Sequence, residues 1–599
     1  MDIITTDIAI VGAGGGGLRA AIAAAEKYPD SSVALISKVY PMRSHTVAAE
    51  GGSAAVIQDH DTLDNHFNDT VAGGDWLCDQ NVVEYFVEHS TEEMLQLEHW
   101  GCPWSRKESG HINVRAFGGM KIERTWFAAD KTGFHMLHTL FQTSTKYSNI
   151  TRYDEYFCHD LLVEDGEVKG LVMINLAEGT FHVIRAKSVI FATGGAGRVY
   201  RYNTNGGIVT GDGMALAYRH GVALRDMEFV QYHPTALPGT GILMTEGCRG
   251  EGGILVNKDG YRYLQDYGMG PETPLGQTKN KYMELGPRDR VSQAFWHEEK
   301  KGNMIDSKWG TVSHLDLRHL GEDKINERLP FIRELAKAYV GVDPVHEPIP
   351  VRPTVHYTMG GICVDPNCET SLKGLFAVGE CASSGLHGAN RLGSNSLAEL
   401  AVLGRVAGEK AAERALTACH ISEQQAIAQA QASQQQAEAL LKDSNGTEKL
   451  GDLRQQLIET MEAGVGIYRE EGLMQTAIDE LADLRKRLGN LKLDDESTVF
   501  NTEWLNAIEF GYMLDVATVM AHSALHRKES RGSHQRIDGY EKRDDDKYLK
   551  HTLAFCNDSG VPDIQYQDVV ITKSQPKERV YGAAAEAQAE AEAKAGGEQ

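Results

Sequence analysis

The sequence predicts an α/β fold, with a parallel-sheet domain interrupted by an inserted α+β domain and followed by a helical domain and a mixed C-terminal segment. Three short apolar runs that end in glycines predict the sheet, at residues 7–11, 189–192 and 375–378. Because these junctions lie far apart along the chain, they indicate one discontinuous domain with a large insertion. The length of 599 residues suits roughly three to four domains of ordinary size.

The elements are expected in a simple order. The first strand leads through a glycine loop to a helix at 18–26 and a second strand at 33–37, and a further helix at 397–418 follows the third junction. Helical periodicity continues from 421 to 525, and the Ala/Glu-rich tail from 583 is typical of disorder. The expected domains are 1–235 with 353–420, the insertion 236–352, the helical domain 421–550 and the C-terminal segment 551–599.

The composition, with 41% hydrophobic and 24% charged residues, is that of a globular protein. It excludes a disordered chain, a collagen and a coiled-coil rod. A net charge of −24 repels phosphate backbones, so we expect no nucleic-acid partner. The nine cysteines form no Cys-x-x-Cys pair, which indicates free thiols in a reducing compartment and no metal or iron–sulfur site within this chain. We also expect no membrane span and no signal peptide.

The glycine loop after the first strand has the spacing Gly12-x-Gly14-x-x-Gly17. Between a strand and a helix this spacing is typical of Rossmann-type dinucleotide binding, because the glycines allow a tight turn, close approach of a pyrophosphate and close helix packing. An NAD site usually has a carboxylate at the end of the second strand, where this chain has Ser37-Lys38. Its absence weakens the nicotinamide interpretation without selecting FAD.

The segment after the second strand places His45 among small residues, from Arg43 to Ser53. A lone histidine is more often a surface or hydrogen-bonded core residue. In a loop that passes over a bound flavin, however, a neutral imidazole nitrogen is a competent nucleophile.

Several motifs follow one another along the chain: Ser44-His45-Thr46 with Glu50-Gly51-Gly52, the glycine-rich segment 192–197, Gly211-Asp212-Gly213, His233-Pro234-Thr235, the segment 356–361, the segment 387–396 and the segment 527–534. In this order they resemble the succinate dehydrogenase/fumarate reductase flavoprotein family of the bacterial quinol-oxidising type. The resemblance implies FAD bound covalently through an 8α-histidyl bond at His45. It implies flavin contacts from Gly12, Ala13, Gly14, Gly15, Gly16, Ile36, Ser37, Lys38, Ser44, His45, Thr46, Glu50, Gly51, Gly52, Tyr156, Phe157, Cys158, Asp212, His356, Tyr357, Glu380, Arg391, Ser394, Asn395, Ser396 and Leu397.

A second cluster of polar residues suits a small dianion. It consists of His233, Thr245, Glu246, Arg249, Arg288, His356 and Arg391. Any one arginine is more often a surface or ion-paired residue, but a buried set of cations needs a counter-charge, and a dicarboxylate supplies it through bidentate guanidinium contacts. The resemblance implies that Arg391 and His356 bind one carboxylate of fumarate and that His233 with Thr245 binds the other.

The resemblance also assigns the chemistry. The flavin delivers a hydride, Arg288 donates the proton, and Glu246 with Arg249 restores it, with His233 at the same catalytic centre. The alternative keeps Arg288 as an electrostatic stabiliser with water as the acid, because a guanidinium pKa lies above ~12. Arg249 also lowers the pKa expected for the neighbouring Cys248 thiol, which makes it a candidate for alkylation; the alternative is an inert core residue.

The expected reaction is fumarate reduction in anaerobic respiration, and Glu50, where many dehydrogenase relatives have Gln, favours this direction over succinate oxidation. The resemblance implies an iron–sulfur subunit, membrane anchor subunits with a quinol site, and a peripheral location on the cytoplasmic face of the bacterial inner membrane. The alternatives are a succinate dehydrogenase flavoprotein, an L-aspartate oxidase, a non-catalytic flavin electron carrier and an interaction scaffold built on the helices at 421–525.

Overall fold

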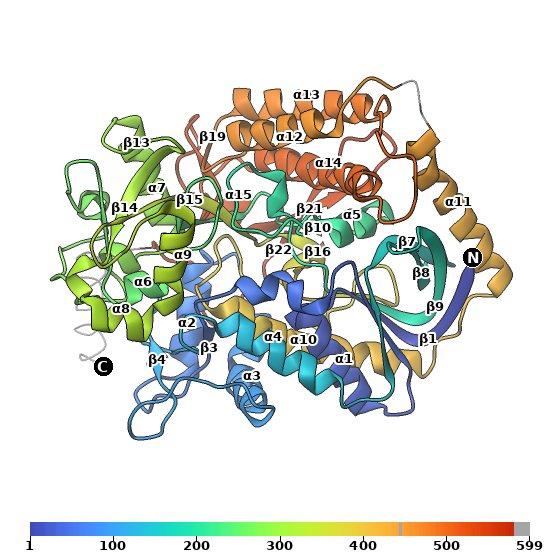
Figure 1. Ribbon diagram of the computed structural model, residues 1–599, viewed down its shortest axis with the longest axis horizontal. Coiled ribbons are helices and arrows are strands. Elements are labelled where there is room, and N and C mark those ends of the chain that lie inside the picture. The colour runs from blue at the N-terminus through green and yellow to red at the C-terminus, as the bar shows by residue number, and fades with distance from the viewer. Residues whose placement is uncertain (443–445, 580–599) are drawn as a thin grey trace.

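A computed structural model describes residues 1–442 and 446–579. The expected disordered tail lies outside the described residues. The α/β fold is confirmed. The inserted domain, called the cap below, the helical domain and the first domain with the main parallel sheet occupy different sides of the molecule (Figure 1).

The main sheet brings the three glycine junctions together. Its order is β6-β2-β1-β9-β8-β7, with β17 paired to β9. The strands are β1 (Asp2–Val11), β2 (Val33–Ser37), β6 (Ile150–Asp154), β7 (Tyr156–Glu164), β8 (Glu167–Asn175), β9 (Thr180–Phe191) and β17 (Leu375–Ala377). Because β1, β2, β6, β9 and β17 pair in parallel, the loops after β1, β9 and β17 emerge at one edge of the sheet.

Both faces of this sheet are covered. Successive residues of β1 point to opposite faces, so Ile8 and Ile10 pack on one side and Ala9 and Val11 on the other. The first side carries α1 (Gly15–Lys27) and α10 (Asn395–Ala415), which pack on each other, together with α3 (Gln80–His99) and α4 (Thr132–Ser144). A parallel sheet buried in this way needs strands that are apolar on both faces, as the sequence predicted.

The cap has its own sheet and core. Its sheet has the order β11-β15-β14-β12, formed by β11 (Val230–Ala236), β12 (Ile254–Val256), β14 (Gly310–Asp316) and β15 (Ile349–Thr358), with β13 (Ile305–Ser307) on β14. Its helices are α6 (Gly247–Gly250), α7 (Arg288–Lys300), α8 (Glu322–Arg328) and α9 (Pro330–Val340). Both expected boundaries of the insertion, near 236 and 352, fall in or at the ends of the paired strands β11 and β15, so these strands connect the cap to the rest of the chain.

The helical domain follows as predicted, with α11 (Glu423–Lys442), α12 (Leu450–Gly464), α13 (Glu471–Leu488) and α14 (Thr502–His526). The last two strands, β21 (Lys550–Phe555) and β22 (Asp563–Asp568), return to the first domain. They extend β10 (Leu224–Arg225), β16 (Gly361–Cys363) and β18 (Ala382–Ser383) into a sheet of order β18-β16-β10-β21-β22. The described strands of the C-terminal segment are therefore part of the body of the molecule.

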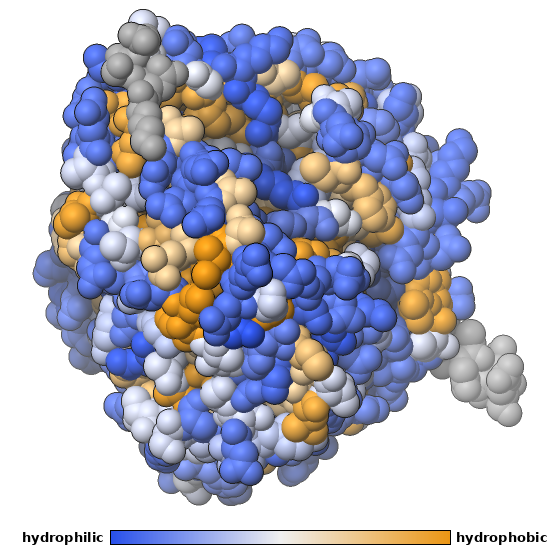
Figure 2. All heavy atoms as spheres, turned by 90° about the vertical axis from the view of Figure 1, so that its right-hand side faces the viewer, coloured by the Kyte–Doolittle hydropathy of each residue, from blue (hydrophilic) through white to orange (hydrophobic). Residues whose placement is uncertain are grey.

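The remaining α-helices and strands of the described residues are mostly short. They are α2 (Leu63–Gly73), α5 (Asp212–Arg219), α15 (Asp545–Tyr548), β3 (Ser53–Ala54), β4 (Val114–Arg115), β5 (Thr125–Trp126), β19 (Tyr468–Arg469) and β20 (Gln535–Arg536). Within the described residues no helix combines the length and the apolar character needed to cross a membrane. The face on the right of Figure 1 is mostly hydrophilic, with smaller hydrophobic patches among the polar side chains (Figure 2).

Candidate active site

A cavity of about 880 Å³ lies where the glycine loops meet, and most of the predicted cofactor residues line it. These are Gly12, Ala13, Gly14, Gly15, Gly16, Ser37, Lys38, Ser44, His45, Thr46, Glu50, Tyr156, Phe157, Cys158, Asp212, His356, Tyr357, Glu380, Arg391, Ser396 and Leu397. Ile36, Gly51, Gly52, Ser394 and Asn395 are not among its lining residues. The volume lies within the range of small-molecule sites.

The geometry of the glycine loop explains two of its glycines. Gly12 has φ +109°, and a Cβ there would lie 2.1 Å from the Ala192 carbonyl oxygen. A Cβ on Gly17 would lie 1.8 Å from the Gly12 carbonyl oxygen, so only glycine lets α1 start this close to the loop. Gly14 is the N-cap of α1 and lines the cavity, so the positive end of the helix dipole, with the first N–H groups that lack partners within the helix, is directed toward it.

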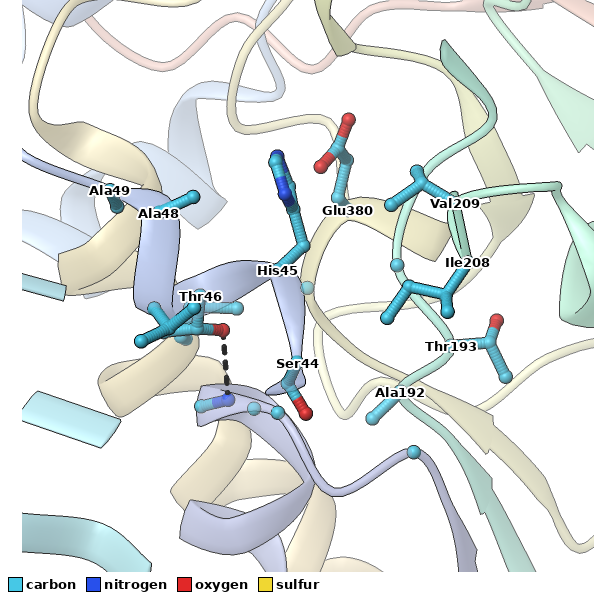
Figure 3. A pocket seen from close by; sticks show the side chains of 18 of the residues that line it. Ser44, His45, Thr46, Ala48, Ala49, Ala192, Thr193, Ile208, Val209 and Glu380 are labelled. Atoms are coloured by element: carbon cyan, nitrogen blue, oxygen red, sulfur yellow. Dashed lines mark hydrogen bonds between the residues drawn. The ribbon is translucent and has the colours of Figure 1, made fainter. Parts of the chain in front are cut away.

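His45 begins a short 3-10 helix at His45–Ala48, and its imidazole projects into the same space as Glu380 (Figure 3). Its Nδ1 accepts a hydrogen bond from the Gly206 N–H at 3.4 Å. Burial lowers the pKa of His45 to about 4, so its imidazole is neutral at pH 7. The next residue, Thr46, accepts a hydrogen bond from the Gly15 N–H at 3.1 Å, which ties this segment to the glycine loop (Figure 3).

Lys38, at the end of β2, has two carboxylate partners. Its Nζ lies 2.6 Å from Asp212 Oδ2 and 2.7 Å from Glu509 Oε1. Burial alone would lower the pKa of Lys38, but the two carboxylates raise it above its usual value. Lys38 and Asp212 were predicted as cofactor residues. Glu509 was not, because it lies on α14, 471 residues after Lys38, and no sequence motif marks it. The position where NAD sites usually carry an acid is thus occupied by a cation.

The predicted catalytic residues converge beside the cavity. Arg288, the first residue of α7, donates from Nε to Glu246 Oε2 at 2.7 Å, and Arg249 Nη2 lies 3.8 Å from the same oxygen. Burial would raise the pKa of Glu246, but the two arginines hold it below its usual value, so the carboxyl group is ionised. All three side chains are buried.

Gln231 links Arg288 and Arg391 and was not predicted from the sequence. Its Oε1 accepts from Arg288 Nη1 at 3.1 Å and from Arg391 Nη2 at 3.2 Å. Gln231 stands two residues before His233 on β11, so the alternation of side chains along a strand was a usable signal. The shared acceptor holds two like charges close together in a buried site.

His233 on β11 and His356 on β15 face each other, with ring centroids 5.2 Å apart. Burial first, and then the nearby Arg288, lower both pKa values well below the usual value, so both rings are neutral. His356 Nδ1 pairs with Thr204 Oγ1 at 2.8 Å. Thr245 is buried in the segment between β11 and α6, next to Glu246.

Several buried polar atoms of this cluster lack a hydrogen-bond partner among the described residues. They are His233 Nε2, Arg391 Nε, and Arg249 Nε and Nη2. An unsatisfied buried donor costs about 1–3 kcal/mol, and more when it is charged. Such a set therefore fits an anionic ligand with several acceptor oxygens.

Glu50 lines the cavity beside a second buried acid, Asp130. Burial, and then the charge of Asp130, raise the pKa of Glu50 well above its usual value. Asp130 Oδ2 accepts the N–H groups of Phe331 at 2.8 Å and Ile332 at 3.3 Å, in the first turn of the cap helix α9. Asp130, Phe331 and Leu335 also line the cavity and were not predicted; the two residues of α9 reach it only because folding brings the cap onto it.

Of the two alternatives for Cys248, an activated thiol and an inert core residue, the structure favours the inert core residue. Its side chain is fully buried, and burial raises its pKa above the ordinary value despite Arg249 beside it. Desolvation of the thiolate outweighs the attraction of the guanidinium here, so Cys248 is a neutral core residue.

Two family models match the chain. One is an FAD binding domain over residues 7–397, and the other is the C-terminal region of fumarate reductase flavoproteins over residues 454–581. The fumarate reductase flavoprotein subunit of Escherichia coli (strain K12) is 67% identical over 99% of this chain and 98% of its own length. The chain belongs to the fumarate reductase and succinate dehydrogenase flavoprotein family.

Both branches of this family are similar to the chain. The succinate dehydrogenase flavoprotein subunit of Rickettsia felis is 41% identical over 94% of this chain and 95% of its own. A solved structure of the E. coli quinol fumarate reductase superposes with a TM-score of 0.95 at 67% identity, covering 97% of this chain and 99% of that one. The fumarate reductase flavoprotein assignment and the FAD-binding fold expected from the sequence are confirmed.

Proposed function

We propose that this chain is the catalytic flavoprotein subunit of a quinol-oxidising fumarate reductase, which reduces fumarate to succinate with an FAD attached covalently to His45. The observation that carries the proposal is the buried cluster of Arg288, Arg391 and two neutral histidines, with donors that lack partners among the described residues. A non-catalytic electron carrier would have no use for such a cluster.

The cavity fits an FAD. The glycine loop and the start of α1 would hold the pyrophosphate, since Gly14, Gly15 and Gly16 line the cavity at the N-terminal end of this helix. His45 is neutral and projects into the cavity, as a nucleophile for covalent attachment must. When bound, the FAD supplies the hydride for the alkene.

The cation cluster would bind and orient a four-carbon dicarboxylate. Arg391 with His356 takes one carboxylate, and His233 with Thr245 takes the other. Two ligand charges offset the cost of burying Arg288 and Arg391 close together, and the free Nε–H of Arg391 and Nε2 of His233 gain partners. Twisting one carboxylate out of the alkene plane weakens its conjugation and makes the carbon more electrophilic.

Arg288 would donate the proton to the second alkene carbon. Its Nε–H already donates to Glu246 Oε2 at 2.7 Å, and Arg249 Nη2 lies 3.8 Å from the same oxygen. Burial, and then the charge of Arg288, lower the pKa of Arg249 below its usual value although Glu246 raises it, and the lowered pKa eases proton movement through these three groups. The second assignment for Arg288 is electrostatic stabilisation, with water as the acid.

We infer partners and location from the family. The relatives at 67% identity carry the name fumarate reductase, which favours fumarate reduction over the succinate oxidation of the more distant relatives. A related solved structure is titled quinol-fumarate reductase with menaquinol molecules. The electrons would reach this chain through an iron–sulfur subunit from membrane anchor subunits with a quinol site, and the chain would lie peripherally on the cytoplasmic face of the inner membrane.

The test combines attachment and turnover. Denaturing gel fluorescence should show flavin on the chain, a protease digest should yield a flavinylated peptide with His45, and His45→Ser should lose both signals. The holoenzyme should oxidise a reduced dye in the presence of fumarate. Arg288→Gln and Arg288→Lys should abolish that turnover while flavin attachment persists and dicarboxylate binding is partly retained; turnover by either variant contradicts the donor role.

A further inference from the structure

Arg391 differs from Arg288 in how its charge is held. Arg288 is paired with the Glu246 carboxylate. For Arg391, none of the ion pairs within 4 Å among the described residues includes it, and its neighbours are the hydroxyl of Ser396, the amide oxygen of Gln231 and an aromatic ring. A buried guanidinium without a carboxylate partner keeps its full charge for a ligand, but it needs other means of being held.

The aromatic ring is that of Tyr357. The Arg391 Cζ lies 4.2 Å from the ring centroid, which is the geometry of a cation–π contact in a buried setting. Arg391 lies in the segment that leads into α10, whereas Tyr357 belongs to β15, so the contact joins two segments that are distant in the sequence and that both line the cavity.

Hydrogen bonds at the Tyr357 hydroxyl fix the position of the ring. The Tyr357 hydroxyl donates to Glu399 Oε2 at 3.2 Å, and His387 Nε2 lies 2.8 Å from the same carboxylate oxygen and 3.3 Å from the hydroxyl. Ser384 donates to Glu399 Oε1 at 3.3 Å. The carboxylate is 1% exposed, and a phenol that donates to it has a more electron-rich face toward Arg391.

We propose that Tyr357 and Glu399 are the positioning residues of Arg391: the phenol ring holds the guanidinium by its face, and Glu399 fixes the ring, so the charge of Arg391 stays available for a substrate carboxylate. The inference rests on the proposed dicarboxylate reaction and adds to it two side chains placed behind the binding group. A ring positions the cation without neutralising it, which a direct carboxylate partner would not do.

The position of Arg391 affects the bound substrate and the transition state alike, so the expected defect is in binding. In the assembled holoenzyme, Tyr357→Leu should raise the KM for fumarate, and the Kd for malonate read from the flavin absorbance, by about tenfold, while kcat changes by less than about threefold. A tenfold change corresponds to about 1.4 kcal/mol, within the range of a desolvated cation–π contact.

Two milder variants separate the ring from its anchor. Tyr357→Phe and Glu399→Gln should each raise the malonate Kd by about threefold, and the double variant should do no more than the larger single change, because Glu399 acts through the phenol hydroxyl. Tyr218→Phe is the matched control: this buried tyrosine donates to the Phe555 carbonyl at 3.4 Å, away from Arg391, and its loss should leave KM and Kd unchanged.

The outcomes are separable. An unchanged malonate Kd in Tyr357→Leu, or in Tyr357→Phe and Glu399→Gln if Tyr357→Leu does not fold, overturns the positioning role. So does a loss of kcat and flavin content at constant KM, which is the signature of a merely structural defect. Additive effects in the double variant overturn the role of Glu399. A parent enzyme that neither binds malonate nor reduces fumarate contradicts the proposed function instead.

Discussion

The protonation of a buried histidine should determine the free energy of opening of the C-terminal strand β21. His551 on β21 lies 2.6 Å from Asp226 Oδ2 through Nδ1 and 3.2 Å from Asp79 Oδ1 through Nε2. Asp79 precedes α3 and also accepts the Val570 N–H at 2.9 Å, and Arg225 lies 3.4 Å from its other oxygen. Both ring nitrogens face carboxylates, so the imidazolium form is the one that fits.

The magnitude follows from the pKa. Burial and Arg225 lower the pKa of His551, but the two carboxylates outweigh them and raise it from 6.5 to about 9. At 1.36 kcal/mol per pKa unit this difference is worth about 3 kcal/mol, or roughly a 300-fold change in a local opening equilibrium. A raised pKa stabilises the folded state fully below pH ~6.5, and that stabilisation is lost as the pH rises through about 9.

The assay is hydrogen exchange of the strand at Lys550–Phe555 in the parent protein and in His551→Gln, compared at the same pH between 6 and 10. The difference in opening free energy between the two proteins should shrink by about 3 kcal/mol across this range. His99→Gln, an exposed histidine at the end of α3, serves as the control and should show no such change. A parent–variant difference that stays constant up to pH 10, or grows, refutes the reasoning.

Three further changes test the fold around the site. Gly17→Ala places a Cβ 1.8 Å from the Gly12 carbonyl oxygen, so it should lower the free energy of unfolding by about 1–3 kcal/mol and remove most of the bound FAD. A normal flavin content contradicts this prediction, and Gly472→Ala, where open space surrounds the added Cβ, is the control. Arg124→Leu leaves Asp61 and Asp69 buried without their cation and should destabilise by about 3–5 kcal/mol in denaturant unfolding; a loss near zero contradicts it. Asp130→Ala removes the acceptor for the first N–H groups of α9 and should cost about 1 kcal/mol, with faster proteolysis at 322–340, whereas Asp130→Asn should cost less; equal proteolysis in all three proteins contradicts it.

The local signals of the sequence predicted much of the fold. A strand, a glycine loop and a helix are encoded within about 20 residues, because periodicity and glycine conformation are properties of neighbouring residues. The β1–Gly12–α1 unit, the strand β2, the helix α10 and the helices from 423 to 526 therefore lie where the sequence placed them. The order of the motifs along the chain also sufficed to recognise the family.

Partners distant in the sequence escaped prediction. Glu509 reaches Lys38 across 471 residues, and His551 binds Asp226 across 325. Gln231 was overlooked although it shares a strand face with His233. The C-terminal strands were expected as a separate segment, and they instead complete a sheet with β10, since strand pairing depends on which edges folding leaves open.

The sequence by itself determined the family, the class of cofactor and the residue types of a cationic pocket. The tertiary structure decided the ionisation and the pairing of those residues. Arg249 is next to Cys248 in the sequence, yet burial determines the pKa of the thiol. Arg288 and Arg391 are the same residue type, yet Arg288 pairs with a carboxylate and Arg391 packs on an aromatic ring. Desolvation and charge–charge energies depend on all surrounding atoms, and only the folded chain brings those atoms together.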